Sequence, residues 1–167
     1  EQEHVILLHD FTFRDPQEVL TELQGGEGAH ARHAQPAEGE HADHDMQQQA
    51  VMLNDILYDA MLANDRTLDD PEVVQAEKGG RFRLRIINAA AASNMWIDLG
   101  EMQGLLIAVD GNAIRPISGS RFPLAVAQRA DIRLSLPSTS GAWPILFQSE
   151  GATLRAGIIL RAGNGTV

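Results

Sequence analysis

The stretch RFRLRIINAA, residues 81–90, decides the fold class that this sequence favours. Its apolar residues Phe82, Leu84 and Ile86 alternate with arginines, so apolar and charged side chains fall on opposite faces of an extended chain. A strand with this pattern has one face against a hydrophobic core and the other toward water. The stretch therefore predicts a sheet that buries one of its two sides.

Further strand patterns lie before and after this stretch. Residues 4–13, 105–117, 121–137, 143–148 and 156–163 are apolar runs bounded by Gly, Pro, Asn or Asp. Asp110-Gly111 is a strong turn signal inside the second run, and the third run is broken near Gln128-Arg129. Together these segments predict roughly eight or nine strands with turn signals about every ten residues, which is typical of a β-sandwich or barrel.

One segment has a helical pattern instead. In DPQEVLTEL, residues 15–23, Asp15 is a suitable N-cap and Pro16 suits the first helical position. Val19, Leu20 and Leu23 fall on one face of such a helix. We expect one short helix in an otherwise all-β chain.

Residues 25–49 interrupt this pattern. They have no hydrophobic period and are rich in Gly, Ala, Gln, His and acids, which predicts a long disordered insertion. Four of the six histidines lie in it: His30, His33, His41 and His44. His30 and His33 are three residues apart, and so are His41 and His44. Imidazoles with nearby carboxylates suit Cu(II), Zn²⁺ or Ni²⁺. The alternatives are a segment with a real, weak metal-handling role or a solvated linker that binds metal only in the test tube.

The composition limits the function further. The chain has 167 residues, enough for one domain with a real core, which we place at residues 1–167. A formal net charge of −10 argues against nucleic acid and anionic lipid as partners. Neither a membrane-spanning apolar run nor a signal peptide is visible, although the chain looks like a piece of a longer one.

The sequence has no cysteine, which excludes thiolate zinc sites, iron–sulfur clusters and a blue-copper centre. It also shows no catalytic triad, nucleophile elbow or well-placed pair of acids, so no catalytic residue is predicted. His4 and His9 are predicted to be satisfied strand histidines rather than ligands. The arginines Arg81, Arg83 and Arg85 are predicted to pair with surface acids.

Several motifs in order carry a family resemblance. They are Ala63-Asn64-Asp65, Pro71 to Gly79, Arg83 to Ala89, Ile107 to Gly111, and Gln128 to Asp131. With them the chain resembles the middle, cupredoxin-like domain of a bacterial multicopper oxidase, over nearly all residues outside 25–49. One departure is Ala127, where the family often has Gly.

The resemblance implies a cupredoxin-like Greek-key β-sandwich or barrel. It also implies a parent oxidoreductase that couples one-electron oxidation of a substrate to reduction of dioxygen. The parent protein would contain copper, and this domain would contain none. The partners of this domain would be neighbouring cupredoxin domains of the same chain. The location implied is periplasmic or secreted.

The segment PILFQSEGATLRAGIIL, residues 144–160, tests this expectation. In a copper-bearing domain of the family the last hairpin carries F-H-C-H, a third His and then A-G-M. Here the matching positions are Gln148, Ser149 and Glu150, followed by Ile158 in place of the axial thioether, with no third His. A hydroxyl and an amide do not hold copper in that geometry, so we expect a structural hairpin.

Two alternatives to the copper-free domain remain. The first is a self-contained metal-binding module that uses His30, His33, His41 and His44. The second is a β-sandwich interaction domain without metal. We expect the flanking sequence and a copper titration to separate these hypotheses.

Overall fold

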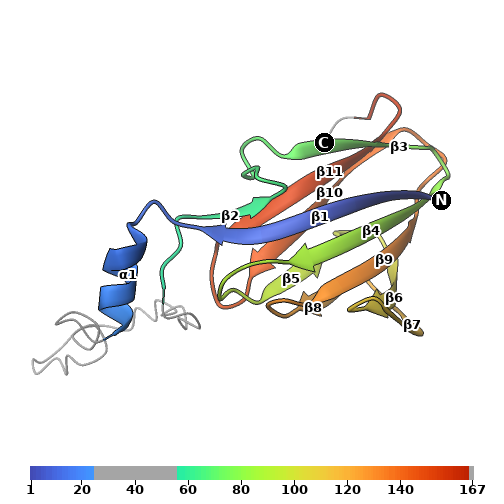
Figure 1. The fold of residues 1–167 in the computed structure, drawn as a ribbon. Coiled ribbons are helices and arrows are strands. Elements are labelled where there is room, and N and C mark those ends of the chain that lie inside the picture. Colours follow the sequence, from blue (N-terminus) through green and yellow to red (C-terminus); the bar gives the residue numbers. More distant parts are fainter. Residues whose placement is uncertain (25–55, 166–167) are drawn as a thin grey trace, which may run out of the picture.

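The computed structural model describes residues 1–24 and 56–165, which form two packed β-sheets and one helix (Figure 1). The six-stranded sheet has the order β2-β1-β4-β9-β6-β7, and the five-stranded sheet has the order β3-β11-β10-β5-β8. The chain passes repeatedly from one sheet to the other, and β1 with β4 and β3 with β11 are parallel pairs. The predicted all-β, cupredoxin-like sandwich is confirmed.

The described residues hold eleven strands, more than the eight or nine expected, because short strands such as β2, β5 and β8 have four residues each. The strands of the six-stranded sheet are β1 (Gln2–Phe11), β2 (Ala60–Ala63), β4 (Arg81–Asn88), β6 (Gly104–Val109), β7 (Asn112–Gly119) and β9 (Arg129–Ser135). Those of the five-stranded sheet are β3 (Glu72–Ala76), β5 (Met95–Asp98), β8 (Arg121–Leu124), β10 (Gly141–Ser149) and β11 (Arg155–Ala162).

Strand β4 behaves as its sequence predicts. Phe82, Leu84 and Ile86 are at most 1% exposed, whereas the arginines between them face outward. The strand lies between β1 and β9, so its apolar face sits at the centre of the sheet. Alternation in the sequence fixes this orientation because a shift by one residue would expose the whole apolar set.

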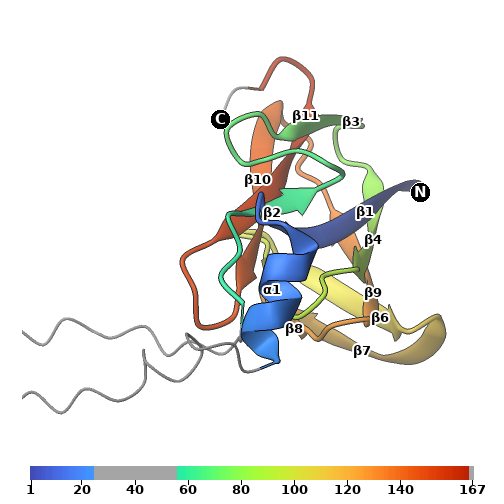
Figure 2. The same ribbon diagram turned by 60° about the vertical axis from the view of Figure 1, so that its left-hand side comes forward.

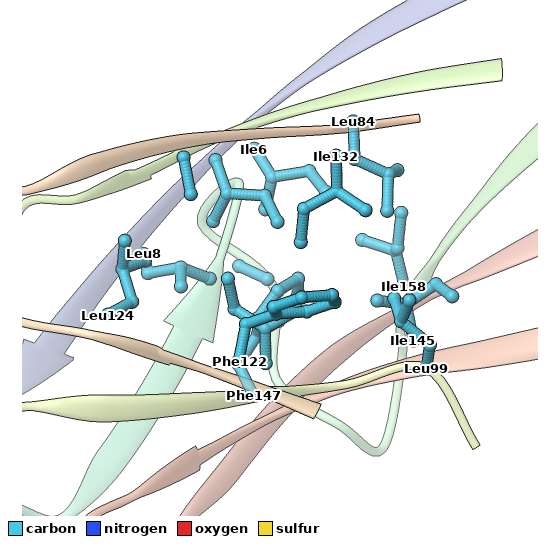
Figure 3. Packing of buried hydrophobic residues seen from close by; sticks show 14 of the residues in the cluster. Ile6, Leu8, Leu84, Leu99, Phe122, Leu124, Ile132, Ile145, Phe147 and Ile158 are labelled. Atoms are coloured by element: carbon cyan, nitrogen blue, oxygen red, sulfur yellow. The ribbon is translucent and has the colours of Figure 1, made fainter. Parts of the chain in front are cut away.

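The core fills the space between the two sheets. Ile6, Leu84 and Ile132 from the six-stranded sheet meet Ile145 and Phe147 from the five-stranded sheet (Figure 3). All of these residues are fully buried. One continuous apolar cluster therefore joins the two layers.

Helix α1 (Pro16–Leu23) is present as expected, with Asp15 as its N-cap. The Asp15 carboxylate accepts hydrogen bonds from the backbone N–H groups of Gln17 and Glu18. The helix stands at one end of the sandwich, however, and none of its residues is buried (Figures 1 and 2). Leu20 and Leu23 are 44% and 47% exposed, so the apolar face of the helix is not part of the core.

Two turns have the backbone that their residues favour. Asp110 and Gly111 join β6 and β7 with φ angles of 52° and 81°, and Val109 pairs directly with Asn112. This is a two-residue hairpin turn with both central residues in the left-handed region, as the Asp-Gly signal predicts. The predicted break near Gln128-Arg129 is also confirmed, since β8 ends at Leu124 and β9 begins at Arg129.

Ala127 lies in that break and has a φ of 64°, a left-handed conformation that costs an L-residue about 1–2 kcal/mol. Ala127→Gly removes the Cβ penalty but adds freedom to the unfolded chain. We therefore expect it to raise the free energy of unfolding by about 0.5 kcal/mol, measured by urea denaturation. Ala113→Gly, on exposed strand β7, is the matched control and should lower stability by about 0.5–1 kcal/mol. Equal losses in both variants would contradict the argument.

Candidate functional site

The hairpin of β10 and β11 is the segment that the resemblance compares with a copper-bearing hairpin, and the sequence predicts that it is structural. The strands pair up to Gln148 and Arg155, and the backbone N–H of Ser149 donates to the carbonyl of Leu154 at 3.0 Å. Ser149 is 3% exposed, on the same inward face as Phe147. The loop at residues 150–154 is thus tight and closes directly after Ser149.

A second segment fastens this loop from the side. The Asn94 carbonyl accepts from the backbone N–H of Glu150 at 2.9 Å, and the Asn94 side-chain amide donates to the Glu150 carboxylate at 3.2 Å. The Asn94 side-chain oxygen also accepts from the N–H of Val126 at 3.1 Å. Gln148 donates to the Ala152 carbonyl at 3.3 Å. These polar side chains hold the loop in shape.

The register separates the positions that the resemblance compares with copper ligands. Ile158 pairs with Ile145, four residues before Ser149 along β10. At about 3.3 Å per residue, positions 149 and 158 are about 13 Å apart along the strand. Both face the core, but side chains there do not converge on one point. Ile158 is therefore a core residue and does not lie beside Ser149 as an axial ligand would.

The residues of this hairpin do not fit copper. Gln148, Ser149 and Glu150 supply an amide, a hydroxyl and a carboxylate, and neither a thiolate nor an imidazole is among them. Type 1 copper needs a thiolate with two imidazoles. In the described residues 1–24 and 56–165, moreover, no group of three or more His, Cys, Asp or Glu side chains is placed to hold a metal.

The four histidines proposed as metal ligands, His30, His33, His41 and His44, lie outside the described residues. The same holds for the predicted insertion at residues 25–49. The hypothesis that these histidines bind metal stays a prediction from the sequence.

His4 and His9 are both engaged with a turn between β2 and β3. Asn64 and Asp65 form this turn, with φ angles of 49° and 61°. His4 Nε2 lies 3.1 Å from a carboxylate oxygen of Glu72, and His9 Nε2 lies 3.0 Å from one of Asp65. Both histidines therefore have structural partners, in agreement with the sequence prediction.

Asn64 is a residue whose role the sequence did not reveal. Its side-chain oxygen accepts from the N–H of Leu7 at 2.8 Å, and its amide donates to the Val5 carbonyl at 3.1 Å and to Glu72 at 2.8 Å. One side chain thus fixes the turn to both β1 and β3. The motif Ala63-Asn64-Asp65 was visible in the sequence, but the strand that it contacts is almost sixty residues earlier.

Glu72 has a lowered pKa in this cluster. Burial raises it, but hydrogen bonds from Asn64 and His4 favour the charged form and bring the pKa of Glu72 below its ordinary value of 4.5. A lowered carboxyl pKa contributes stability that is present above pH 4.5 and is lost as the pH falls through the folded-state value.

Glu72→Gln tests this contribution. We expect the variant to be less stable than the wild-type chain by about 1 kcal/mol at pH 7, since the charge-assisted hydrogen bonds are lost. The difference should shrink as the pH falls from 4.5 through the lower folded-state pKa of Glu72, because the wild-type carboxyl then becomes protonated. Thermal unfolding between pH 3 and pH 7 measures it, with Glu77→Gln on the exposed surface as control. A difference that does not depend on pH would refute the linkage.

The outward arginines of β4 are paired for the most part. Arg83 forms an ion pair with Asp131 of β9, and Arg85 lies 3.6 Å from Glu3 of β1 and 3.8 Å from Asp131. Arg133 of β9 pairs in turn with Glu1. The predicted pairing with surface acids is confirmed for Arg83 and Arg85.

Two sheets connected in this way, with parallel pairs at β1–β4 and β3–β11, define a cupredoxin-like β-sandwich. A family model described as multicopper oxidase matches residues 2–164. The chain belongs to the multicopper oxidase family.

One relative agrees with this assignment, and two solved structures share the fold. The multicopper oxidase MmcO of Mycobacterium tuberculosis is 29% identical over 112 residues, which cover 67% of this chain and 22% of that protein. Fet3p, a multicopper oxidase that functions in iron import, has a TM-score of 0.67 at 11% identity, with 96% of this chain and 27% of that chain covered. The laccase of Botrytis aclada has a TM-score of 0.64 at 18% identity, with 100% and 30% covered.

In each comparison the match covers most of this chain but only a small part of the relative. This chain spans 22% of the mycobacterial relative and about a third or less of the two structures. It is therefore similar to one part of a larger oxidase. Among the described residues, no helix is long and apolar enough to cross a membrane.

Proposed function

We propose that this chain is the middle cupredoxin-like domain of a multicopper oxidase, and that it binds no copper itself. In this role it holds two neighbouring copper-bearing domains at a fixed separation and orientation. The parent protein oxidises its substrate in one-electron steps and reduces dioxygen, with copper in the other domains. The parent is periplasmic or secreted, as the family resemblance implies.

The donor set of the β10–β11 hairpin is the observation that carries this proposal. The sequence has no cysteine, and positions 148–150 hold an amide, a hydroxyl and a carboxylate. The tight loop after Ser149 and the distance to Ile158 add a geometric reason, because the ligand positions do not converge. A family member without a ligand set in its last hairpin suits a spacing role.

The size of the match supports the same role. The chain covers 22% to 30% of the relatives described above, so each has room for further domains of similar size. The ordered sandwich, with its continuous apolar core, provides a stiff body between such domains. Stiffness is what a spacer needs, because electron transfer depends on a fixed geometry.

A copper titration of this chain tests the proposal. We expect no intense blue band and no copper bound more tightly than roughly micromolar, since the described residues offer no thiolate–imidazole set. The comparison variant changes His30, His33, His41 and His44 to alanine together. A second variant, Ser149→Ala, should leave any copper binding unchanged.

Two results of this titration would contradict the proposal. Tight, stoichiometric copper binding that the four-histidine variant abolishes would replace the proposal with a metal-binding module. Tight binding that Ser149→Ala abolishes would instead make the hairpin a metal site. Weak binding that all three proteins share would support the copper-free spacer.

A further inference from the structure

One asparagine of this chain is followed directly by glycine. The sequence has six asparagines, and only Asn164 has a glycine, Gly165, as the next residue. When an asparagine side chain closes on its own backbone, the nucleophile is the nitrogen of the following residue, and a Cβ on that residue hinders its approach. Gly165 has no Cβ, so its backbone reaches conformations that are closed to other residues. Asn164-Gly165 is therefore the pair in this sequence that favours such a reaction.

The structure places this pair in an exposed turn. The turn follows β11, which ends at Ala162, and Gly163 opens it with a φ of 65°. Asn164 is exposed. Neither the Asn164 side chain nor the Gly165 N–H has a hydrogen-bond partner among the described residues. The nitrogen and the side-chain carbonyl carbon are thus neighbours in the chain, and no hydrogen bond to the described structure has to break before they meet.

The other asparagines that the structure describes are held more firmly. Asn64, Asn88 and Asn94 each make two or more side-chain hydrogen bonds. Asn112 is exposed like Asn164 and donates one bond of 3.4 Å. It is the first residue of β7, however, and is followed by Ala113, which has a Cβ. Asn112 is therefore the matched comparison for Asn164.

We propose that Asn164 is a site of spontaneous deamidation through a succinimide. The Gly165 nitrogen attacks the side-chain carbonyl carbon, Cγ, of Asn164 and forms a new N–Cγ bond. The Cγ–Nδ2 bond breaks, and ammonia leaves with the proton that the Gly165 nitrogen gives up. Water then opens the five-membered ring. Opening at the N–Cγ bond gives aspartate, whereas opening between the nitrogen and the backbone carbonyl carbon gives isoaspartate.

Isoaspartate would change how the end of β11 is held. Gly165 packs directly against Gly141, the first residue of β10, because a Cβ at Gly165 would overlap the Gly141 backbone. Isoaspartate leads the main chain through the former side chain and adds a carbon atom between residues 164 and 165. The contact with Gly141 does not keep its geometry when the backbone lengthens at this point, because close packing leaves no room for the shift.

The new carboxylate has a smaller effect. Lys78 lies beside the turn, since a Cβ at Gly163 would be 3.0 Å from the Lys78 Nζ. Deamidation would place a negative charge near this ammonium group, but Lys78 and Asn164 are both exposed. Exposed ion pairs contribute little to stability. The longer backbone of isoaspartate, not the charge, is therefore the main structural consequence.

Incubation of the purified chain at mildly alkaline pH tests the proposal. Trypsin cuts after Arg161 and after Arg85, which places Asn164 and Asn112 in different peptides. Mass spectrometry follows the conversion of amide to acid, and an unincubated sample corrects for deamidation during digestion. We expect Asn164 to convert about tenfold faster than Asn112, which corresponds to an activation barrier lower by about 1.4 kcal/mol. The rate should rise with pH, because the attacking nitrogen must lose its proton.

A second readout and two variants distinguish ring closure from simple hydrolysis. Methylation by an isoaspartyl methyltransferase measures isoaspartate, which simple hydrolysis of the amide does not produce. Asn164→Gln should remove almost all isoaspartate at this position, since glutamine would have to close a larger ring. Asn112→Gln is the matched control and should leave the rate at Asn164 unchanged. Circular dichroism verifies that both variants are folded.

Either of two other results overturns the inference. If the Asn164 amide persists as long as that of Asn112, the contact with Gly141 holds the Gly165 nitrogen away from Cγ. If Asn164 becomes aspartate without any isoaspartate, no succinimide forms. Neither result bears on the copper titration, so this inference and the proposed function are tested separately.

Discussion

Asn88→Ala is expected to lower the free energy of unfolding by about 3 kcal/mol, the largest effect of a polar substitution that this structure supports. Asn88 is the last residue of β4 and is fully buried. Its side-chain amide donates to the carbonyls of Ser93 and Leu124 at 3.0 and 3.2 Å, and its oxygen accepts from the N–H of Ala90 at 3.1 Å. Alanine would remove all three hydrogen bonds.

The position of Asn88 explains why the effect is large. The bonds join the end of β4, in the six-stranded sheet, to the loop before β5 and to the end of β8, which are both strands of the five-stranded sheet. Its backbone also pairs with Gln128 and Ala127 in the turn before β9. A buried backbone group that loses its partner costs about 1–3 kcal/mol, since no water replaces the bond.

Urea denaturation of the chain, followed by circular dichroism, measures the loss. Asn112→Ala is the control: Asn112 is exposed and donates one bond of 3.4 Å, so its removal should cost at most about 0.5 kcal/mol. Asn88→Asp tests the two donated hydrogen bonds without a large change in the shape of the side chain. Aspartate keeps the acceptor for the Ala90 N–H but places a carboxylate against the carbonyls of Ser93 and Leu124. If Asn88→Asp matched the wild-type stability at pH 7, the two donated bonds would not be the cause.

Phe147→Ala is the second large effect, with an expected loss of about 3–5 kcal/mol. Phe147 is 0% exposed, on the inward face of β10 between Ala156 of β11 and Ile97 of β5. Its ring lies beside Phe122 in the core (Figure 3). Removing it leaves a cavity between the sheets that the neighbouring residues fill only in part.

Phe13→Ala provides the matched control. Phe13 is 85% exposed and has one aromatic contact, with the ring of Phe11 at 4.9 Å between centroids. We expect it to cost no more than about 1 kcal/mol. Both variants are measured by urea denaturation under the same conditions. Similar losses at the two positions would show that Phe147 does not occupy a tightly packed core.

Some features of this chain were predictable because they depend on neighbours in the sequence. The alternation in residues 81–88 fixed which face of β4 is buried, and Asp110-Gly111 fixed a two-residue turn. Asp15 and Pro16 fixed the start of α1. The missing cysteine and the residues at 148–150 excluded a blue-copper site from chemistry alone.

Other features depend on residues that are far apart in the chain. Leu20 and Leu23 have the spacing of a core-facing helix, but they are 44% and 47% exposed. Whether an apolar helix face is covered depends on where the chain places the helix. The comparison of Ile158 with an axial ligand likewise failed because the strand register, not the order of residues, sets the distance to Ser149.

The sequence by itself thus determined the strands, the tight turns and the chemistry that the last hairpin lacks, because each follows from a few adjacent residues. The tertiary structure alone decided the roles of Asn64 and Asn88 and the pairing of Arg83 with Asp131. These interactions join strands dozens of residues apart. Their free energies depend on which surfaces the fold brings together, and local sequence patterns do not specify those surfaces.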